Sequence, residues 1–150
     1  MPADLTRRSA VEIAAALRAC EVSAVEVLEA HLGVIDHLNP RLNAIVTLAA
    51  DAARETARAA DKEIAVGNDN LPPLLGLPVV IKDIVETAGM RTTWASPVYA
   101  NHVPEEDAEV VARLRQAGAI ILGKSNTPEF GAGANTDNEL FGPTGNPWDP

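Results

Sequence analysis

The spacing of apolar and polar residues predicts helices over the first third of the chain. Ser9 and Ser23 each begin the tetrapeptide SAVE, which places a glutamate three residues after a serine in the capping-box pattern of a helix start. The first helix is predicted to end near Ala19, and the second at Asn39-Pro40. The apolar face of the second helix is formed by Leu28, Leu32, Ile35 and Leu38. Charged residues at helical spacing predict a third, amphipathic helix over 49–64.

Short apolar runs predict strands at 44–48, 77–81 and 119–122. The last two are continuously apolar, which is typical of strands buried on both faces of a sheet. A helix is predicted between them over 105–116, and the order strand, helix, strand indicates a parallel crossover. The buried stripe of this helix is predicted to be Val110, Val111 and Leu114, with Gly118 as its stop. A short helix is predicted to begin at Thr127-Pro128, ahead of an irregular segment over 135–150.

Composition and charge narrow the classes of function. Hydrophobic residues make up 47% of the chain and aromatic residues only 3%, which favours a helix-rich α/β protein. A net charge of −9 with scattered basic residues argues against nucleic-acid binding. The single cysteine, Cys20, is expected to be a small core residue and fits a reducing compartment. No segment approaches the ~20 apolar residues of a membrane span, so we expect a cytoplasmic protein.

Two lysines follow predicted strands, and either could carry chemistry. Lys82 comes after the run VVI, and Lys124 after IILG. Ligands of open α/β sheets bind beyond the carboxyl ends of the strands. A lysine that loses solvation there has a lowered pKa, and its neutral amine can act as a general base. A lysine that simply emerges into solvent is the commoner interpretation, and the pattern does not choose between the two residues.

Other candidate groups give weaker signals. The three histidines show no metal-ligand spacing, so no metal site is predicted. Gly131-Ala132-Gly133 is only a fragment of a glycine-rich loop, for which a tight turn is the simpler interpretation. Asp83 and Glu86 flank Lys82, but we expect this carboxylate pair to be solvated rather than catalytic.

Five longer segments, in their order and spacing, resemble the amidase signature family. They are LLGLPVVIKD at 74–83, TTWAS at 92–96, DAEVVARL at 107–114, AGAIILGKSNTPEF at 117–130 and FGPTGNPWDP at 141–150. The resemblance covers nearly the whole chain. It implies that residues 1–150 are the N-terminal part of a single amidase domain of α/β class. The helical layer would span about 5–66, and a larger mixed sheet would begin over about 77–150.

The resemblance also implies a chemistry. Family members hydrolyse carboxamides through a Ser-cisSer-Lys triad, and the catalytic lysine ends the strand of the segment GLPxxxKD. That position matches Lys82, so the resemblance selects Lys82 over Lys124 as the base. The two serines follow the segment NPWDP in the family, beyond Pro150, and neither Ser96 nor Ser125 matches their motif. We therefore expect the chain alone to be inactive.

The remaining implications concern substrate and partners. Gly131, Ala132 and Gly133 match a family region on the acyl side of the substrate cleft, although close helix packing explains these small residues equally well. No cofactor or metal is implied, because serine and lysine suffice for acyl transfer. The expected partner is a small-molecule amide, with neither nucleic acid nor membrane, and a homodimer is a candidate assembly of the full-length enzyme.

Two alternatives stay open from the sequence. The chain could belong to the amidase component of a glutamyl-tRNA amidotransferase, which hydrolyses glutamine and passes ammonia to a partner. It could also be a non-catalytic truncated fragment that binds a partner or does nothing. For the isolated chain we predict aggregation or loose packing, because its strands lack the rest of their sheet.

Overall fold

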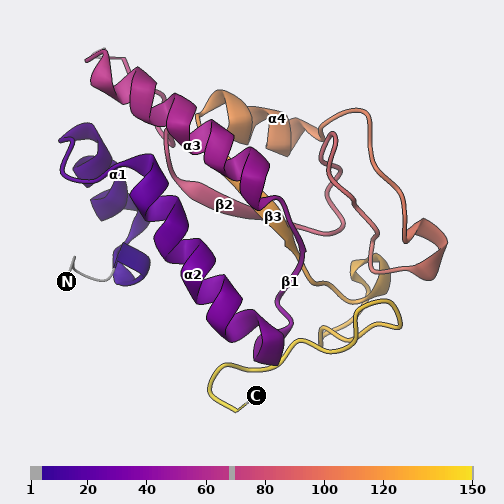
Figure 1. Ribbon diagram of the computed structural model, residues 1–150. Coiled ribbons are helices and arrows are strands. Elements are labelled where there is room, and N and C mark those ends of the chain that lie inside the picture. Colours follow the sequence, from indigo (N-terminus) through magenta and orange to yellow (C-terminus); the bar gives the residue numbers. More distant parts are fainter. Residues whose placement is uncertain (1–4, 68–69, 150) are drawn as a thin grey trace.

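The computed structural model describes residues 5–67 and 70–149. Its regular elements, drawn in Figure 1, begin with helices, and from α2 onward α-helices and strands alternate. In chain order they are η1 (Leu5–Arg7), α1 (Ala10–Arg18), α2 (Ala24–Leu42), β1 (Ile45–Leu48), α3 (Ala50–Ala65), β2 (Pro78–Lys82), η2 (Pro97–Tyr99), α4 (Glu109–Gln116), β3 (Ile120–Ser125) and η3 (Glu129–Gly131).

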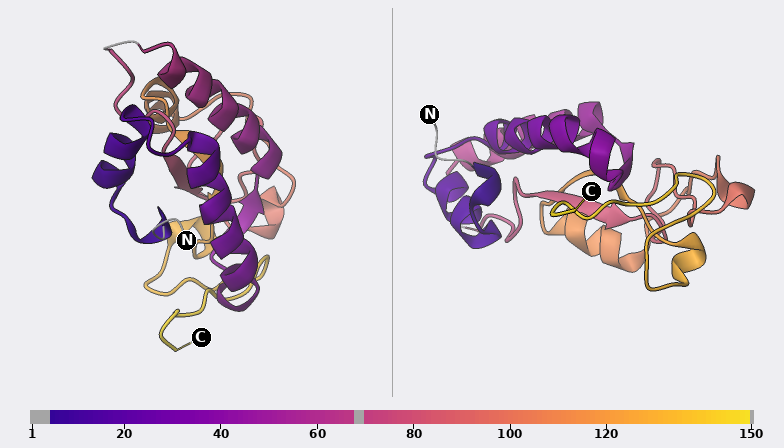
Figure 2. Two further views of the ribbon diagram at one scale, coloured as in Figure 1. Left: turned by 60° about the vertical axis from the view of Figure 1, so that its left-hand side comes forward. Right: turned by 90° about the horizontal axis from the view of Figure 1, so that it is seen from below.

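Within the described residues, three strands form one mixed sheet in the order β1-β3-β2. Strand β3 is central, parallel to β2 and antiparallel to β1. Helices α2 and α3 cover one face of this sheet and α4 covers the other (Figure 2). The predicted parallel crossover from β2 through α4 to β3 and the predicted α/β class are confirmed. Strand β1 lies in the sheet although its residues fall within the range expected for the helical layer.

Burial of β3 on both faces is also confirmed. Ile120 and Leu122 pack with the helices α1 to α3, while Ile121 packs with Ile81 and Val111 on the α4 side. The alternation of side chains along a strand explains this division. The sheet therefore separates two apolar cores, and the polar groups described below lie at the carboxyl ends of its parallel strands.

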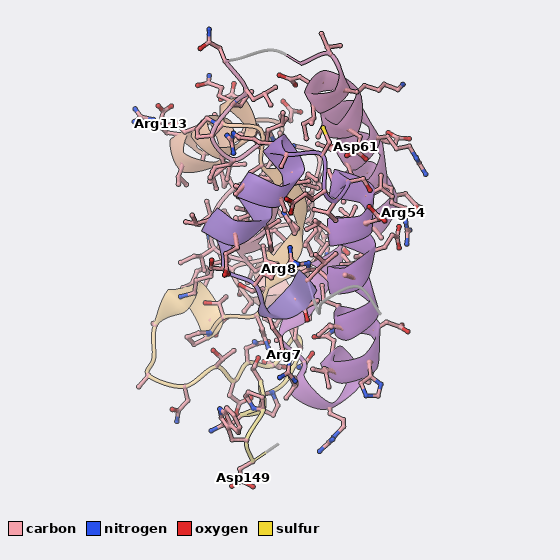
Figure 3. The ribbon with its side chains drawn as sticks, turned by 90° about the vertical axis from the view of Figure 1, so that its left-hand side faces the viewer. Arg7, Arg8, Arg54, Asp61, Arg113 and Asp149 are labelled. Carbon is pink, nitrogen blue, oxygen red and sulfur yellow. The ribbon has the colours of Figure 1, made fainter. Side chains whose placement is uncertain are left out.

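Side chains of α3 hold helix α2 in place. Both predicted capping boxes are present, at Ser9 and Ser23. The Asp61 carboxylate accepts hydrogen bonds from the backbone N–H groups of the first two residues of α2, where the helix dipole favours a negative charge. Arg54 forms an ion pair with Glu29 across the two helices at 2.6 Å (Figure 3 labels Arg54 and Asp61).

Two predicted boundaries are wrong for identifiable reasons. Helix α2 continues through Pro40 to Leu42, because a proline in the last turn removes only one N–H donor and Asn43 then ends the helix at φ 51°. Helix α4 begins at Glu109 instead of residue 105, because the Ala108 N–H donates to the Glu86 carbonyl oxygen in an extended segment.

Three side chains also lie where the apolar pattern did not predict them. Leu38 and Val110 are exposed, so the buried stripes of their helices are narrower than predicted. Cys20 is exposed and ends α1 at φ 55° instead of joining the core. The helix predicted at Thr127-Pro128 is a single turn, η3, and Thr127 is buried without capping it.

Candidate active site

Lys82 is the last residue of β2 and pairs with Ser125 of β3. Its side chain is exposed, so the predicted loss of solvation at Lys82 is not found in the described part of the chain. The next residue, Asp83, is fully buried, against our expectation of a solvated carboxylate. The strand therefore ends with an accessible amine beside a carboxylate held in the protein.

Asp83 holds the segment TTWAS against the end of β2. Its carboxylate accepts hydrogen bonds from both the backbone N–H and the hydroxyl of Thr93. Its backbone carbonyl accepts from the Trp94 N–H at 2.8 Å, and the Trp94 indole donates to the Ile84 carbonyl at 2.9 Å. Hydrogen bonds to a carboxylate, such as the two from Thr93, are charge-assisted and roughly twice as strong as neutral ones. The chain thus folds back on itself directly after Lys82.

Lys124 lies inside β3 rather than after it, and a register shift decides where it points. Val79 pairs with Ile121 but Val80 pairs with Gly123, so Leu122 is an extra residue on β3. One extra residue reverses the faces of all later side chains on a strand. Lys124 consequently points to the same face as Ile81, its pairing partner, and away from the α2–α3 core.

The Lys124 ammonium is fully buried in a polar site made by the segment that follows β2. Nζ donates to the Val85 carbonyl oxygen, to Thr87 Oγ1 at 3.0 Å and to Thr92 Oγ1 at 2.8 Å. Both hydroxyls donate their own protons to backbone carbonyls, so only their lone pairs face the lysine. Desolvation lowers the pKa of Lys124 to about 8. The negative charges of Asp83, Glu86 and Asp107 raise this pKa, but by less than desolvation lowers it.

These surroundings make Lys124 a structural cation. An ammonium has three N–H donors and Nζ meets three acceptors among the described residues, so a neutral amine would leave one acceptor unpaired. A general base must also come within hydrogen-bond reach of the proton that it abstracts. Lys124 has no exposed surface for such an approach, whereas Lys82 has. Accessibility thus favours Lys82 as the base, although Lys124 is the lysine whose pKa desolvation lowers.

The three small residues predicted to bind substrate divide into two environments. Gly131 lies beside Ile84, two residues after Lys82, at φ 72°. Ala132 and Gly133 are exposed. The N–H of Phe130 donates to the Trp94 carbonyl oxygen at 2.8 Å, which joins this turn to the segment TTWAS. The structure therefore brings Gly131 toward the Lys82 region, while substrate binding by all three stays a prediction.

An aromatic group borders this region and was not anticipated from the sequence. Trp94 contacts Tyr99 edge-on with ring centroids 4.6 Å apart and stacks on His102 at 5.4 Å. Tyr99 also meets Phe130, whose side chain is 56% exposed. Trp94, Tyr99 and His102 lie close together in the chain, and Phe130 joins them only through the fold.

Two serines lie close to this region, and neither matches the family's serine motif: Ser125 pairs with Lys82 in the sheet, and Ser96 belongs to the segment TTWAS. Ser96 is 1% exposed and its Oγ has no hydrogen-bond partner among the described residues, while Ser125 is half-buried in β3. The same part of the chain holds no group of three His, Cys, Asp or Glu side chains arranged for a metal ion. Nor does any helix within it combine the length and the hydropathy that a membrane span requires.

The mixed sheet, the helices on both of its faces and the lysine at the end of β2 define part of an α/β domain. The chain belongs to the amidase signature family, whose amidase model matches residues 26–150. It is 48% identical over 146 residues to a glutamyl-tRNA(Gln) amidotransferase subunit of Acidothermus cellulolyticus, covering 97% of this chain and 29% of that protein.

Solved structures agree with this assignment. A 6-aminohexanoate cyclic dimer hydrolase bound to its substrate superimposes with a TM-score of 0.85 at 32% identity, covering 98% of this chain and 29% of the hydrolase. A bacterial aryl acylamidase of the amidase signature family gives a TM-score of 0.85 at 30% identity over 95% of this chain and 30% of its own. The chain thus spans about 30% of the length of the proteins it matches.

Proposed function

We propose that this chain forms the N-terminal part of a cytoplasmic amidase that hydrolyses a small-molecule carboxamide, with Lys82 as its general base. The observation that carries the proposal is Lys82 itself, an accessible amine at the carboxyl end of a parallel strand in the family's segment GLPVVIKD. Hydrogen bonds between buried Asp83 and the segment TTWAS fix the backbone directly after Lys82. Matched proteins named for amide hydrolysis support the reaction class.

In the proposed reaction Lys82 acts on a serine pair supplied beyond residue 150. The neutral amine accepts a proton from the cis-serine, which has taken it from the nucleophilic serine. The nucleophile attacks the amide carbon, and the C–N bond breaks as the proton returns from Lys82 through the cis-serine to the leaving nitrogen. Water then hydrolyses the acyl-enzyme and frees the nucleophilic serine. We propose that the remaining part of the enzyme also covers Lys82, because exclusion of water favours the uncharged amine that the reaction requires.

The first test is the reading frame after the codon for Pro150. We expect a glycine-flanked Ser-Ser pair shortly downstream, and a frame without one would leave the non-catalytic fragment as the better interpretation. In the full-length enzyme, Lys82→Ala should lower kcat by several orders of magnitude, as loss of a triad member does. Lys62→Ala is the matched control, since Lys62 is an exposed lysine on α3, and it should leave kcat unchanged. Near-normal turnover of the Lys82 variant would rule out its role as base.

A second candidate function is favoured by the curated relatives. Several proteins at 41–48% identity are named as subunits of glutamyl-tRNA(Gln) amidotransferases. If this chain belongs to such a protein, the full-length form should copurify with partner subunits and release ammonia from glutamine. Activity of the isolated protein on simple amides, without partners and without preference for glutamine, would favour the free amidase.

A further inference from the structure

We propose that Lys124 is a positioning residue for Lys82, because its buried ammonium fixes the segment 85–92 that follows the catalytic strand. The inference rests on the proposed function, in which the amine of Lys82 is the general base. Lys124 would touch neither substrate nor the serines. It would act through the backbone that leaves β2, and its loss should change the geometry at Lys82 more than the affinity for substrate.

The contacts of Nζ reach both halves of this segment. Val85 and Thr87 lie just after β2, and Thr92 lies where the chain returns to it. One ammonium therefore closes a loop whose ends are also joined by the hydrogen bonds between Asp83 and Thr93. This loop is held at its two ends by Asp83 and Thr93 and in its interior by Lys124, so it has few alternative conformations. Such restriction is needed to place a reacting group reproducibly.

A short path through the sheet joins Lys124 to Lys82. Lys124 pairs with Ile81 in the parallel register, and its neighbour Ser125 pairs with Lys82. The Ser125 carbonyl oxygen then accepts the Asp83 N–H at 3.0 Å. The backbone on which Lys82 stands is thus held from β3 on one side and from the loop on the other.

The chemistry of the site argues for a specific role beyond stability. Burying a cation costs desolvation free energy, and replacing a buried charge together with its polar partners by apolar side chains often stabilises a protein. Here the hydroxyls of Thr87 and Thr92 donate their protons to the carbonyls of Val85 and Met90, which leaves the hydroxyl lone pairs facing Nζ. The site is arranged around the N–H donors of Nζ, and an apolar replacement would leave the lone pairs of both threonine hydroxyls without a donor.

The test uses the full-length enzyme and separates folding from positioning. Lys124→Met removes the charge, and the triple variant Lys124→Met with Thr87→Val and Thr92→Val also removes both hydroxyls, which leaves the carbonyls of Val85 and Met90 without their donors. We expect both variants to have a lowered Tm, so kcat is measured well below it. In both, kcat should stay about 100-fold low with KM changed less than about threefold, and the amides of 84–93 should exchange hydrogen faster.

Thr92→Val alone provides a milder variant that keeps the ammonium and loses one acceptor. It should fold normally, with a kcat about tenfold low and faster exchange over 84–93. Wild-type kcat in either the triple variant or Thr92→Val would overturn the inference. That failure differs from failure of the proposed function, in which Lys82→Ala itself would keep its activity.

Discussion

Lys82 and Lys124 stand at the ends of neighbouring parallel strands, yet the fold gives them opposite environments. Lys82 ends the edge strand β2 and is exposed, while Lys124 lies in the central strand β3 and is fully buried. The desolvation argument that made both lysines candidates applies only to Lys124, and there the ammonium is enclosed by three acceptors. Burial of a lysine is therefore insufficient evidence of a base, because access to its lone pair decides what it can do.

The largest expected effect separates the two lysines by stability. Lys124→Ala should lower the free energy of unfolding of the full-length protein by about 3–5 kcal/mol, because it leaves the two buried threonine acceptors without a donor and creates a cavity. Lys82→Ala should lower it by less, because the Lys82 side chain is exposed in the described part of the chain and fills no site there. Urea unfolding of both variants measures the difference, and equal losses would show that the two environments are alike.

A smaller effect is expected from pH. The folded pKa of Lys124 is about 8, below its usual 10.5, so the unfolded chain binds more protons between these values. The wild-type protein should therefore gain stability as pH rises from about 8 to 10.5, by at most about 3 kcal/mol. Lys124→Met should lack this gain in parallel urea titrations, whereas Lys62→Met, at an exposed lysine of α3, should keep it. A Lys124→Met titration that follows the wild type would show that another group is responsible.

The smallest expected effect tests the carboxylates beside Lys82. Asp83→Asn should cost about 1–3 kcal/mol, because a neutral amide replaces the carboxylate that accepts from the Thr93 N–H and hydroxyl. Glu86→Gln is the matched control on the same segment and is only half-buried, so its cost should be below about 0.5 kcal/mol. Thermal unfolding distinguishes the two, and a neutral Asp83→Asn would remove Asp83 as the anchor of TTWAS.

Much of the fold follows from local patterns in the sequence. The capping boxes at Ser9 and Ser23 set the starts of α1 and α2, because serine and glutamate at this spacing satisfy free N–H groups of the first turn. The apolar runs predicted β2 and β3, and the helix between them gave their parallel pairing. The family resemblance, carried by segments spread along the chain, is confirmed over residues 26–150.

The environments of the two lysines could not be predicted in the same way. Lys124 faces its polar site because Leu122 is an extra residue in the register with β2, and a bulge is set by pairing between strands rather than by local sequence. Gly123 shows the same limit, since a Cβ there would come within 2.3 Å of the Thr47 carbonyl oxygen of β1. The acceptors for Nζ come from residues 32 to 39 positions earlier, and no local pattern links them to Lys124.

The position of β1 has a consequence for synthesis on the ribosome. Leu48 pairs with Gly123, so β1 leaves the ribosome some 75 residues before its partner strand. At about 5–20 residues per second, β1 and the helices around it wait several seconds for β3 to be made. Pairing across such long sequence separations slows folding. Nascent α2, β1 and α3 would pass through this interval with their sheet-facing apolar side chains uncovered.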